Sequence, residues 1–577
     1  MKWNILNKIQ ITKQNNDYII ATLLKNRGIV SKNDIEQFLN PSLKQLEKDF
    51  FDKKQLIKAI KRIKQAIQNQ EQIIVYSDYD VDGITGTAIL WETLHDLGAT
   101  TMPFVPDRFK HGYGLSRKGI DALLNKYPET KLIITIDNGI TAVEEVAYLR
   151  QKGIDVIITD HHTIPKKKPD PFALIHTTEL SGSGVAYVFS KKLTKRVPRH
   201  SRESGNPRDP RSESGMTNND HLSLAAVGTI ADLVPLVGPN RVIATLGLEE
   251  LSKTKRIGLA ALLEVCGLSN QKIDTYHVGF MIAPRINAAG RLAQGIEALQ
   301  LLCTKSRERA YLLAERLNNL NQERQVMMSS AFEHAQSNIS QENKLLFVSH
   351  ESYHEGIIGL VAGNLAEKFY RPAIVVSVGK EVSKASARSI KGFNIIETIR
   401  MASDLLVDVG GHPMAAGFSV KTEQLVQLEE ELHTLFNNQV TDALLEKQMT
   451  VDMELSLSQI TDELYTSISR MKPYGVGNHE PVFVSHDVTI SDARIIGREG
   501  KHIKLKVSYC HSRVSGNLRD PRSESGMTHF DAIGFNMANH YAELLSEKSF
   551  DIAYSVMENE WNGEKSLQLK LKDMRFS

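Results

Sequence analysis

The sequence is poor in cysteine and lacks any long apolar run. Only three cysteines occur, Cys266, Cys303 and Cys510, far apart and outside any Cys-x-x-Cys pattern. Neither a disulfide framework nor a zinc site is indicated, and a reducing cytoplasm is the simplest location. No stretch of about 18 apolar residues occurs, and the N-terminus lacks the apolar segment of a secretion signal. We therefore expect neither export nor a membrane span.

An excess of charge of either sign is also absent. The 70 basic and 68 acidic side chains give a formal net charge of +2, so any basic groove for a nucleic acid must be local. A hydrophobic share of 41% with 24% charged residues is typical of ordinary soluble proteins. The length of 577 residues is several times that of a usual domain, so about two to four domains are expected.

The chain is organised around residues 75–86, VYSDYDVDGITG, where Asp78, Asp80 and Asp82 follow the apolar run 73–75. Because alternate residues of an extended segment point the same way, we expect the three carboxylates to converge at the end of a strand. Like charges held that close raise one another's pKa unless a cation lies among them, which favours a divalent metal site. The alternatives are a solvated acidic turn and a calcium loop, although the spaced glutamate of a calcium loop does not follow.

Two further apolar runs end in similar side chains. The run KLIITID ends in Asp137, and the run VIITDHH supplies Asp160, His161 and His162. The order of strand, loop and helix predicts a parallel α/β sheet, in which the carboxyl ends of the strands line one ligand-binding crevice. Taken singly, such an aspartate is often a helix cap and such a histidine often a core residue. Together with the three aspartates they form a ligand set that suits manganese or magnesium better than zinc.

The segments DYDVDG, TIDNG and TDHH, in this order, resemble motifs one to three of the DHH phosphoesterase superfamily. The fourth motif should be an aspartate on an apolar helix, and LAAVGTIADLVPL supplies Asp232. Further along, PRINAAGR (284–291), SARSIKGFN (386–394) and GGHPMAAGF (410–418) resemble the RecJ branch, which comprises 5′→3′ exonucleases of single-stranded DNA with a DHHA1 domain. The ordered motifs extend this resemblance from about residue 50 to the C-terminus.

The resemblance implies two divalent cations, Mn²⁺ or Mg²⁺, at one shared site. Asp80 together with Asp78 would hold one ion, and Asp137 would bridge to the other. The remaining ligands of the second ion would be Asp82, His161 and Asp232.

The resemblance also implies roles in catalysis and in substrate binding. His162 would contact the scissile phosphate or assist the leaving group, and Asp160 would orient a ligand histidine. In the DHHA1 region, glycines that let backbone amides approach an anion, together with Arg, Ser and His donors, suit a terminal phosphate. From the residues alone, the two glycines of GGH would be read as a tight turn. The implied substrate-binding residues are Arg285, Ser386, Arg388, Ser389, Gly411 and His412.

The predicted fold class is α/β, with a parallel-sheet DHH domain, a smaller α/β DHHA1 domain and a C-terminal barrel. Residues after about 445 alternate as short strands, which favours a barrel of the OB type that tracks single-stranded backbone. The predicted segments are a helical lead-in (1–45), the DHH domain (46–300), linking helices (301–342), the DHHA1 domain (343–445) and the OB-type domain (446–577).

Two segments of 18 residues, 200–217 and 511–528, are identical except at two positions. Such identity between different domains does not fit a solenoid, which needs adjacent units at a fixed period. They resemble palindromic coding insertions of some intracellular bacteria. Because each copy is rich in Ser, Arg, Gly and Pro and nearly devoid of apolar residues, we expect disordered loops whose removal leaves activity intact.

The function implied by the resemblance is a metal-dependent 5′→3′ exonuclease of single-stranded DNA that serves repair and recombination. We expect a monomer without a membrane partner, and a helicase or a single-strand-binding protein stays open as a partner. One alternative is a phosphodiesterase of the same superfamily that acts on short oligonucleotides or small molecules, and the barrel argues against it. The other is a non-catalytic DNA-binding scaffold, which the full set of ligand positions disfavours.

Overall fold

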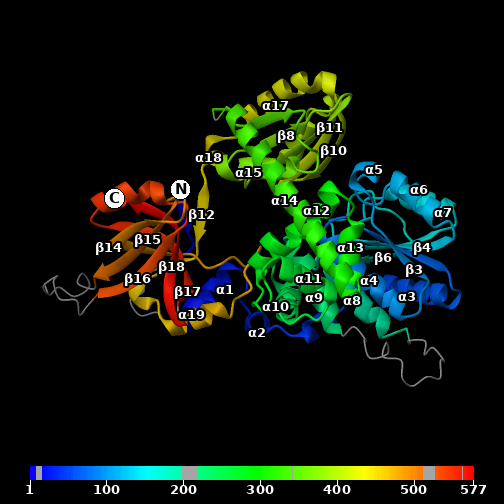
Figure 1. Cartoon of the computed structure of the whole chain (residues 1–577), viewed down its shortest axis with the longest axis horizontal. Coiled ribbons are helices and arrows are strands. Elements are labelled where there is room, and N and C mark those ends of the chain that lie inside the picture. The colour runs from blue at the N-terminus through cyan, green and yellow to red at the C-terminus, as the bar shows by residue number, and fades with distance from the viewer. Residues whose placement is uncertain (8–15, 198–217, 341, 511–526, 562, 577) are drawn as a thin grey trace. The chain divides into compact units, whose positions relative to one another are not determined.

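The computed structural model describes residues 1–7, 16–197, 218–340, 342–510, 527–561 and 563–576. The chain divides into two compact units, residues 41–445 and residues 1–40 with 446–577. Each unit is described by itself below, with the elements labelled as in Figure 1. Among the helices of the described ranges, none is long and apolar enough to cross a membrane.

The first part of unit 41–445 is built on a five-stranded parallel sheet with the strand order β3-β2-β4-β5-β6. Side chains alternate between its faces, so Ile73 and Val75 enter one core while Ile74 and Tyr76 enter another. This burial on both faces explains the continuous apolar runs and confirms the predicted parallel α/β sheet. The strands are β2 (Gln72–Ser77), β3 (Thr101–Phe104), β4 (Thr130–Ile136), β5 (Asp155–Asp160) and β6 (Ala173–His176).

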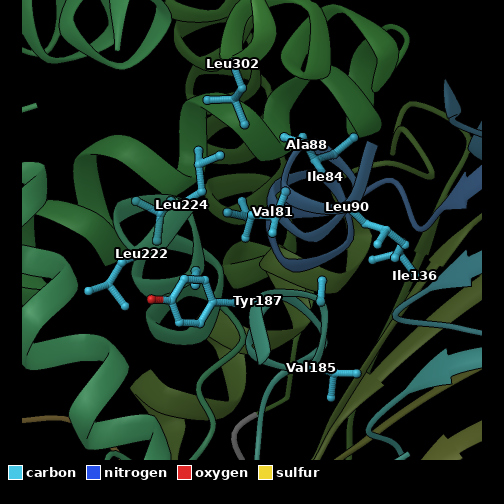
Figure 2. Packing of buried hydrophobic residues seen from close by; sticks show 14 of the residues in the cluster. Val81, Ile84, Ala88, Leu90, Ile136, Val185, Tyr187, Leu222, Leu224 and Leu302 are labelled. Carbon is cyan, nitrogen blue, oxygen red and sulfur yellow. The ribbon is translucent and has the colours of Figure 1, made fainter. Parts of the chain in front are cut away.

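Helices surround this sheet and extend into a helical layer. Figure 2 shows Val81, Ile84 and Ala88 of α4 in the larger core together with Tyr187 and Leu224, and all five residues are buried. The helices are η1 (Leu43–Glu47), α3 (Lys53–Gln68), α4 (Val81–Asp96), α5 (Arg108–His111), α6 (Arg117–Lys126), α7 (Val143–Gln151), α8 (Gly182–Thr194), α9 (Asn218–Ala231), α10 (Gly238–Leu251), α11 (Ile257–Val265), η3 (His277–Ile282), α12 (Ala283–Leu292) and α13 (Ile296–Cys303).

Where several linking helices are predicted, the chain forms one helix of 32 residues, α14 (Arg307–Asn338), capped by Ser306. It leads to a second, mixed sheet with the order β10-β11-β9-β8-β7, in which only β7 and β8 are parallel. Its elements are β7 (Leu346–His350), α15 (Ile358–Phe369), β8 (Ala373–Ser377), β9 (Val382–Arg388), α16 (Ile395–Arg400), η4 (Ser403–Leu405), β10 (Leu406–His412), β11 (Ala415–Lys421), η5 (Thr422–Gln424), α17 (Leu425–Gln439) and α18 (Asp442–Leu445).

The other unit contains a closed barrel. Its sheet has the order β13-β14-β15-β16-β18-β17, and β14 also pairs with β17, which closes the sheet and confirms the predicted barrel. Its elements after residue 445 are β12 (Gln448–Val451), β13 (Met453–Glu454), η6 (Leu457–Gln459), α19 (Asp462–Ser469), β14 (Phe483–Ile496), β15 (His502–Cys510), β16 (Met527–Gly534), η9 (Ala538–His540), α20 (Tyr541–Ser546), β17 (Phe550–Trp561) and β18 (Glu564–Phe576).

The N-terminal residues differ from the helical lead-in that is predicted for 1–45. They contain β1 (Lys2–Ile5) before α1 (Asn16–Asn26) and α2 (Lys32–Leu39), and β1 pairs in parallel with β12. Residues 1–40 therefore belong to the same unit as the barrel. A strand of four residues carries too little periodicity to be recognised without its partner.

The two 18-residue segments, predicted to be disordered loops, lie outside the described residues except for Met527 and Thr528, which begin β16. The first segment falls between α8 and α9, and the second between the paired strands β15 and β16. Both therefore occur at connections between elements.

Candidate metal centre

The first three aspartates lie where β2 leads into α4. Asp78 follows β2 directly, Asp80 is the N-cap of α4, and Asp82 lies in the first helical turn. The carboxylate of Asp80 accepts a hydrogen bond of 3.0 Å from the backbone N–H of Gly83. The prediction that the three alternate along an extended segment is therefore wrong. The backbone turns into a helix immediately after Asp80, and a Cβ at Gly83 would lie 2.7 Å from the Cβ of Asp78.

The buried carboxylate of Asp82 is held by the N-terminus of α8. It accepts hydrogen bonds from the backbone N–H groups of Gly182, at 2.6 Å, and Ser183, at 3.0 Å. The unpaired amides and the dipole at a helix N-terminus favour an anion at this place. A Cβ on Gly228 of α9 would lie 2.6 Å from Asp82 Oδ1, so glycine there lets α9 approach the carboxylate.

The other predicted ligands come from β4, β5 and α9. Asp137 follows β4 in a left-handed conformation with φ of 61°, which is uncommon for a residue other than glycine. His161 follows β5, and its Nε2 lies 3.1 Å from Asp137 Oδ1 and 3.5 Å from Asp232 Oδ2. Asp232 directly follows α9, so the helix carries the carboxylate to the ends of the strands.

The potential ligand atoms form groups in which all atoms lie within 4.8 Å of one another. Two of these groups have the composition that the resemblance implies for the two ions, and Asp137 belongs to two of the three groups. The groups are Asp78, Asp80 and Asp137; Asp82, His161 and Asp232; and Asp137, His161 and His162.

The electrostatics of this cluster favour a bound cation. Burial, together with repulsion from Asp80, raises the pKa of Asp78 to about 8. Burial and the nearby Asp82 raise the pKa of Asp232 to about 9, and the same causes raise the pKa of Asp137 well above its usual value. Burial also lowers the pKa of His161, which keeps its imidazole neutral as a ligand must be. Without a cation these carboxylates hold protons at neutral pH.

Four buried side-chain atoms of the cluster have no hydrogen-bond partner. They are Asp78 Oδ2, Asp137 Oδ1, His161 Nε2 and Asp232 Oδ2. Buried polar atoms are rarely left unsatisfied, so their convergence favours a bound species that accepts lone pairs. Oxygen-rich ligands with a single imidazole suit Mn²⁺ or Mg²⁺. The residues present therefore fit a divalent cation site.

Asp160 holds His162, rather than the ligand His161 that it is expected to orient. His162 Nδ1 lies 2.7 Å from Asp160 Oδ1, which also accepts the backbone N–H groups of both histidines. Burial raises the pKa of Asp160, but the hydrogen bond and the charge of His162, together with the backbone N–H groups of Ile140 and His162, outweigh it and lower the carboxyl pKa. The same bond raises the pKa of His162. An ionised Asp160 therefore fixes a histidine that can carry a proton beside the metal ligands.

Tyr113 is a site residue without a motif in the sequence to mark it. Its side chain acts on Asp78, where it contributes to lowering the pKa of the carboxyl against the effect of burial. Its ring meets Tyr79 edge-on with 6.1 Å between centroids, while 64% of the residue is exposed. An exposed ring beside the metal ligands can contact a substrate.

A second cluster of opposite charge lies in the same unit. Arg388 at the end of β9 donates to Ser386 Oγ at 3.1 Å, and Arg291 of α12 donates to the carbonyl of Gly356 at 3.1 Å. Burial and the charges of Arg108, Arg324 and Arg388 lower the pKa of Arg291 to about 10. Within the described residues, no ion pair joins these four arginines to a carboxylate. Clustered cations without a counterion favour a bound anion.

The structure separates Arg285 from this cluster. Its Nε donates to Asn318 Oδ1 at 3.1 Å and its Nη1 to the carbonyl of Met281 at 2.6 Å, so it braces α12 against α14. Arg291, the other arginine of the same motif, is the one in the cluster. Both arginines belong to the motif PRINAAGR, and only the side of α12 from which each side chain extends distinguishes them. Arg108 stands on the short α5 and has no sequence signal.

Of the remaining predicted substrate residues, Ser386, Gly411 and His412 lie on strands and Ser389 directly follows β9, so the glycines of GGH form no tight turn. Ser389 is buried and donates to the carbonyl of Phe393 at 2.7 Å. Gly411 and His412 end the exposed strand β10. Arg388 pairs with Ala415, which pairs with His412, so Arg388 and His412 are in register two strands apart. This spacing of about 9.6 Å lets one extended anion reach both.

Three family models match the chain. Residues 72–229 match the N-terminal domain of the DHH family, residues 342–438 the DHHA1 domain, and residues 451–573 the RecJ OB domain. The matched ranges follow the parallel sheet, the mixed sheet and the barrel, respectively.

Similar proteins extend over most of the chain. The single-stranded-DNA-specific exonuclease RecJ of Bacillus subtilis is 35% identical over 97% of this chain and 68% of its own length. The protein of the same name from Haemophilus influenzae is 32% identical, with 89% of each chain covered. The crystal structure of RecJ in complex with Mn²⁺ from Thermus thermophilus matches with a TM-score of 0.79 and 27% identity, covering all of this chain and 80% of the other. The chain therefore belongs to the RecJ family of single-stranded-DNA-specific exonucleases.

Proposed function

We propose that this protein removes nucleotides from the 5′ end of single-stranded DNA, in DNA repair and recombination, by hydrolysis at two divalent cations. The observation that carries the proposal is the set of four unsatisfied ligand atoms among six converging metal-ligand candidates. Family membership supports the exonuclease over the two alternatives, a small-molecule phosphodiesterase and a non-catalytic scaffold. The barrel supplies the domain type that binds single strands.

When bound, the two cations would neutralise the scissile phosphate and lower the pKa of the attacking water. Asp78 and Asp80 would hold one cation. The other would be held by Asp82, His161 and Asp232, and Asp137 would contribute to both.

The protein's own acid and base groups complete the reaction. His162, with its pKa raised by Asp160, would donate a proton to the leaving oxygen or a hydrogen bond to the phosphate. Asp160 would keep the ring in place through the bond to Nδ1. The exposed ring of Tyr113 would contact the strand next to the scissile bond.

The polarity of the reaction would come from the arginine cluster. Arg108, Arg291 and Arg388 would bind the 5′-terminal phosphate, with Ser386 placed by its bond to Arg388. A phosphate held at this cluster would set how many nucleotides extend from the end to the metal ligands. In this proposal one DNA strand contacts two sites of opposite charge, the arginine cluster with its 5′ end and the metal ligands with its scissile bond.

Single strands labelled at the 5′ or the 3′ end test the reaction. With Mn²⁺ present, a 5′ label should be released at once as a short product, while a 3′-labelled strand should shorten progressively. Without divalent cation, neither label should be released. Progressive shortening of the 5′-labelled strand would refute the polarity, and cleavage in a chelator would refute the metal mechanism.

The phosphate site is tested by Arg388→Ala, with Arg400→Ala as the matched control on the surface. Arg388→Ala should lose the preference for 5′-phosphorylated over 5′-hydroxyl strands, because the charged partner of the phosphate is gone. Arg400 is exposed on α16, so its removal should leave the preference unchanged. An unchanged preference in Arg388→Ala would place the phosphate elsewhere.

The proposal includes a cytoplasmic monomer that acts with a helicase or a single-strand-binding protein. Sedimentation of the purified protein checks the oligomeric state. Addition of a single-strand-binding protein to the cleavage assay checks the partner, since a cooperating partner should raise the rate on long strands.

A further inference from the structure

Two large aromatic side chains are stacked on the surface of unit 41–445. Tyr276 and Phe280 lie with ring centroids 5.0 Å apart and planes 26° apart, and 60% and 70% of these residues are exposed. Apolar residues one helical turn apart usually face a core. Here Val278 and Ile282 take that place, fully buried, while the aromatic pair faces outward. Two neighbouring aromatic side chains with this much exposure to water need a physical explanation.

The backbone beneath the pair explains the outward orientation. Residues 275–292 are continuously helical, but His277–Ile282 form a π-turn directly before α12. Pro284 follows, and its missing N–H prevents the regular hydrogen bond to the carbonyl of Phe280. A proline and an inserted π-turn are recognised causes of such a change in helical phase, and π-turns often occur at functional sites.

The same helical segment leads to the candidate metal centre. Pro284, Asn287 and Arg291 follow one another at intervals of three and four residues, so they share one face of α12, and all three are partly exposed. The side chain of Asn287 accepts a hydrogen bond from the backbone N–H of Val81, between Asp80 and Asp82, at 3.2 Å. Arg291 belongs to the arginine cluster.

Along the helical segment 275–292 the order is therefore Arg291 in the arginine cluster, Asn287 beside the metal loop, and then the aromatic pair. Phe280 precedes Asn287 by seven residues, or about 10 Å along the helix axis. A strand whose 5′ phosphate lies near Arg291 and whose scissile bond lies at the metal loop continues, on its 3′ side, toward Phe280 and Tyr276. The open aromatic face therefore lies on the helical segment toward which bases 3′ of the scissile bond would run.

We propose that Tyr276 and Phe280 form a stacking platform for the bases of the substrate strand on the 3′ side of the scissile bond. The inference rests on the proposed 5′→3′ function and assigns a further part of the same substrate path. Stacking on aromatic rings suits any base, because every base has a π-face, and so fits an exonuclease that must accept all sequences. The platform would hold the strand between successive cleavages.

The direct test places a single 2-aminopurine at successive positions of a 5′-phosphorylated oligothymidylate and measures its fluorescence on binding in chelator. Wild-type protein should quench the probe at one or two positions 3′ of the scissile bond. The Tyr276→Ala/Phe280→Ala variant should lose this quenching. Its affinity for long strands should fall about tenfold, while its affinity for strands too short to reach the platform stays unchanged.

Substitutions that separate stacking from packing make the test specific. Phe280→Leu keeps an apolar side chain but removes the π-face, so it should lose the quenching, and Phe280→Trp should keep it. Leu312→Ala on α14 is the control, because 63% of Leu312 is exposed and it offers no ring. Circular dichroism of every variant should match that of the wild type, since none of these side chains is buried.

Three results would overturn the platform. They are unchanged quenching in the double alanine variant, quenching only at bases on the 5′ side, and equal losses in Phe280→Leu and Leu312→Ala. Failure of the proposed function is distinguishable, because wild-type protein would then not degrade strands from the 5′ end with Mn²⁺ although the quenching in chelator persisted. Loss of the platform alone would instead leave cleavage of short strands from the 5′ end intact.

Discussion

Replacing Asp137 by asparagine removes one charge from the metal centre while keeping the shape of the side chain. Oxygen atoms of Asp78, Asp80 and Asp137 lie within 4.8 Å of one another. Two unit charges at that distance repel by about 3.5 kcal/mol for an effective dielectric constant of about 20. A carboxyl with a raised folded-state pKa contributes stability that is lost as the pH rises through that pKa. Metal-free Asp137→Asn should therefore be more stable than the wild type at alkaline pH.

In the presence of Mn²⁺ the wild type should instead be more stable than Asp137→Asn. The wild type should gain stability from the bound cation, since anything that binds only the folded state stabilises it, and Asp137→Asn should gain little. Its cleavage of single strands should fall about 100-fold or more, because even residues behind the ligands contribute 10- to 100-fold.

Thermal unfolding with chelator or Mn²⁺ at two pH values, beside a cleavage assay, measures both effects. Asp404→Asn, on an exposed turn, is the matched control and should change neither. Equal stabilisation of Asp137→Asn and the wild type by Mn²⁺ would refute the assignment of Asp137, and so would a lower alkaline stability of the metal-free variant.

Three other perturbations test further parts of the structure. Because a cation must displace the proton that Asp232 holds below a pKa of about 9, the Mn²⁺ concentration for half-maximal cleavage should rise as the pH falls from that value. Glu92→Gln should lower the unfolding free energy by about 3 to 5 kcal/mol in denaturant titration, because it leaves the buried guanidinium of Arg256 without its ionic partner. Joining Cys510 to Met527 by Asn-Gly, in place of residues 511–526, should keep near-native cleavage, because Cys510 and Met527 are paired at the ends of two antiparallel strands.

Much of the fold follows from local patterns in the sequence. The runs around Ile73 and Ile133 are apolar without alternation because both faces of the parallel sheet are covered, and this alone predicts the sheet. Strand ends that carry Asp137 and His161 then predict one crevice. The ligand Asp232 depends on the family motif, because an acid that follows an apolar helix is as readily a solvated surface residue.

The failures concern features set by distant contacts or by competing local signals. Asp80 is both a ligand candidate and a helix cap, and the capping bond to Gly83 turns the chain before any strand alternation develops. Arg108 has no neighbours in sequence that mark it, since its cluster forms only when α5, α12 and β9 come together. The exposure of Tyr276 and Phe280 likewise has no local sequence signal, because it accompanies a π-turn that only the structure shows.

The two charged clusters explain how a protein with almost no net charge can act on a polyanion. Without cations the carboxyl groups around Asp137 offer a phosphate no positive charge, whereas the arginines around Arg291 attract one at any metal concentration. In the proposed reaction the 5′ end would therefore bind first, and cation binding would then make the metal centre attractive to the scissile phosphate. The opposite signs of the clusters thus separate binding of the strand end from cleavage, and the aromatic faces of Tyr276 and Phe280 would hold the strand without adding charge.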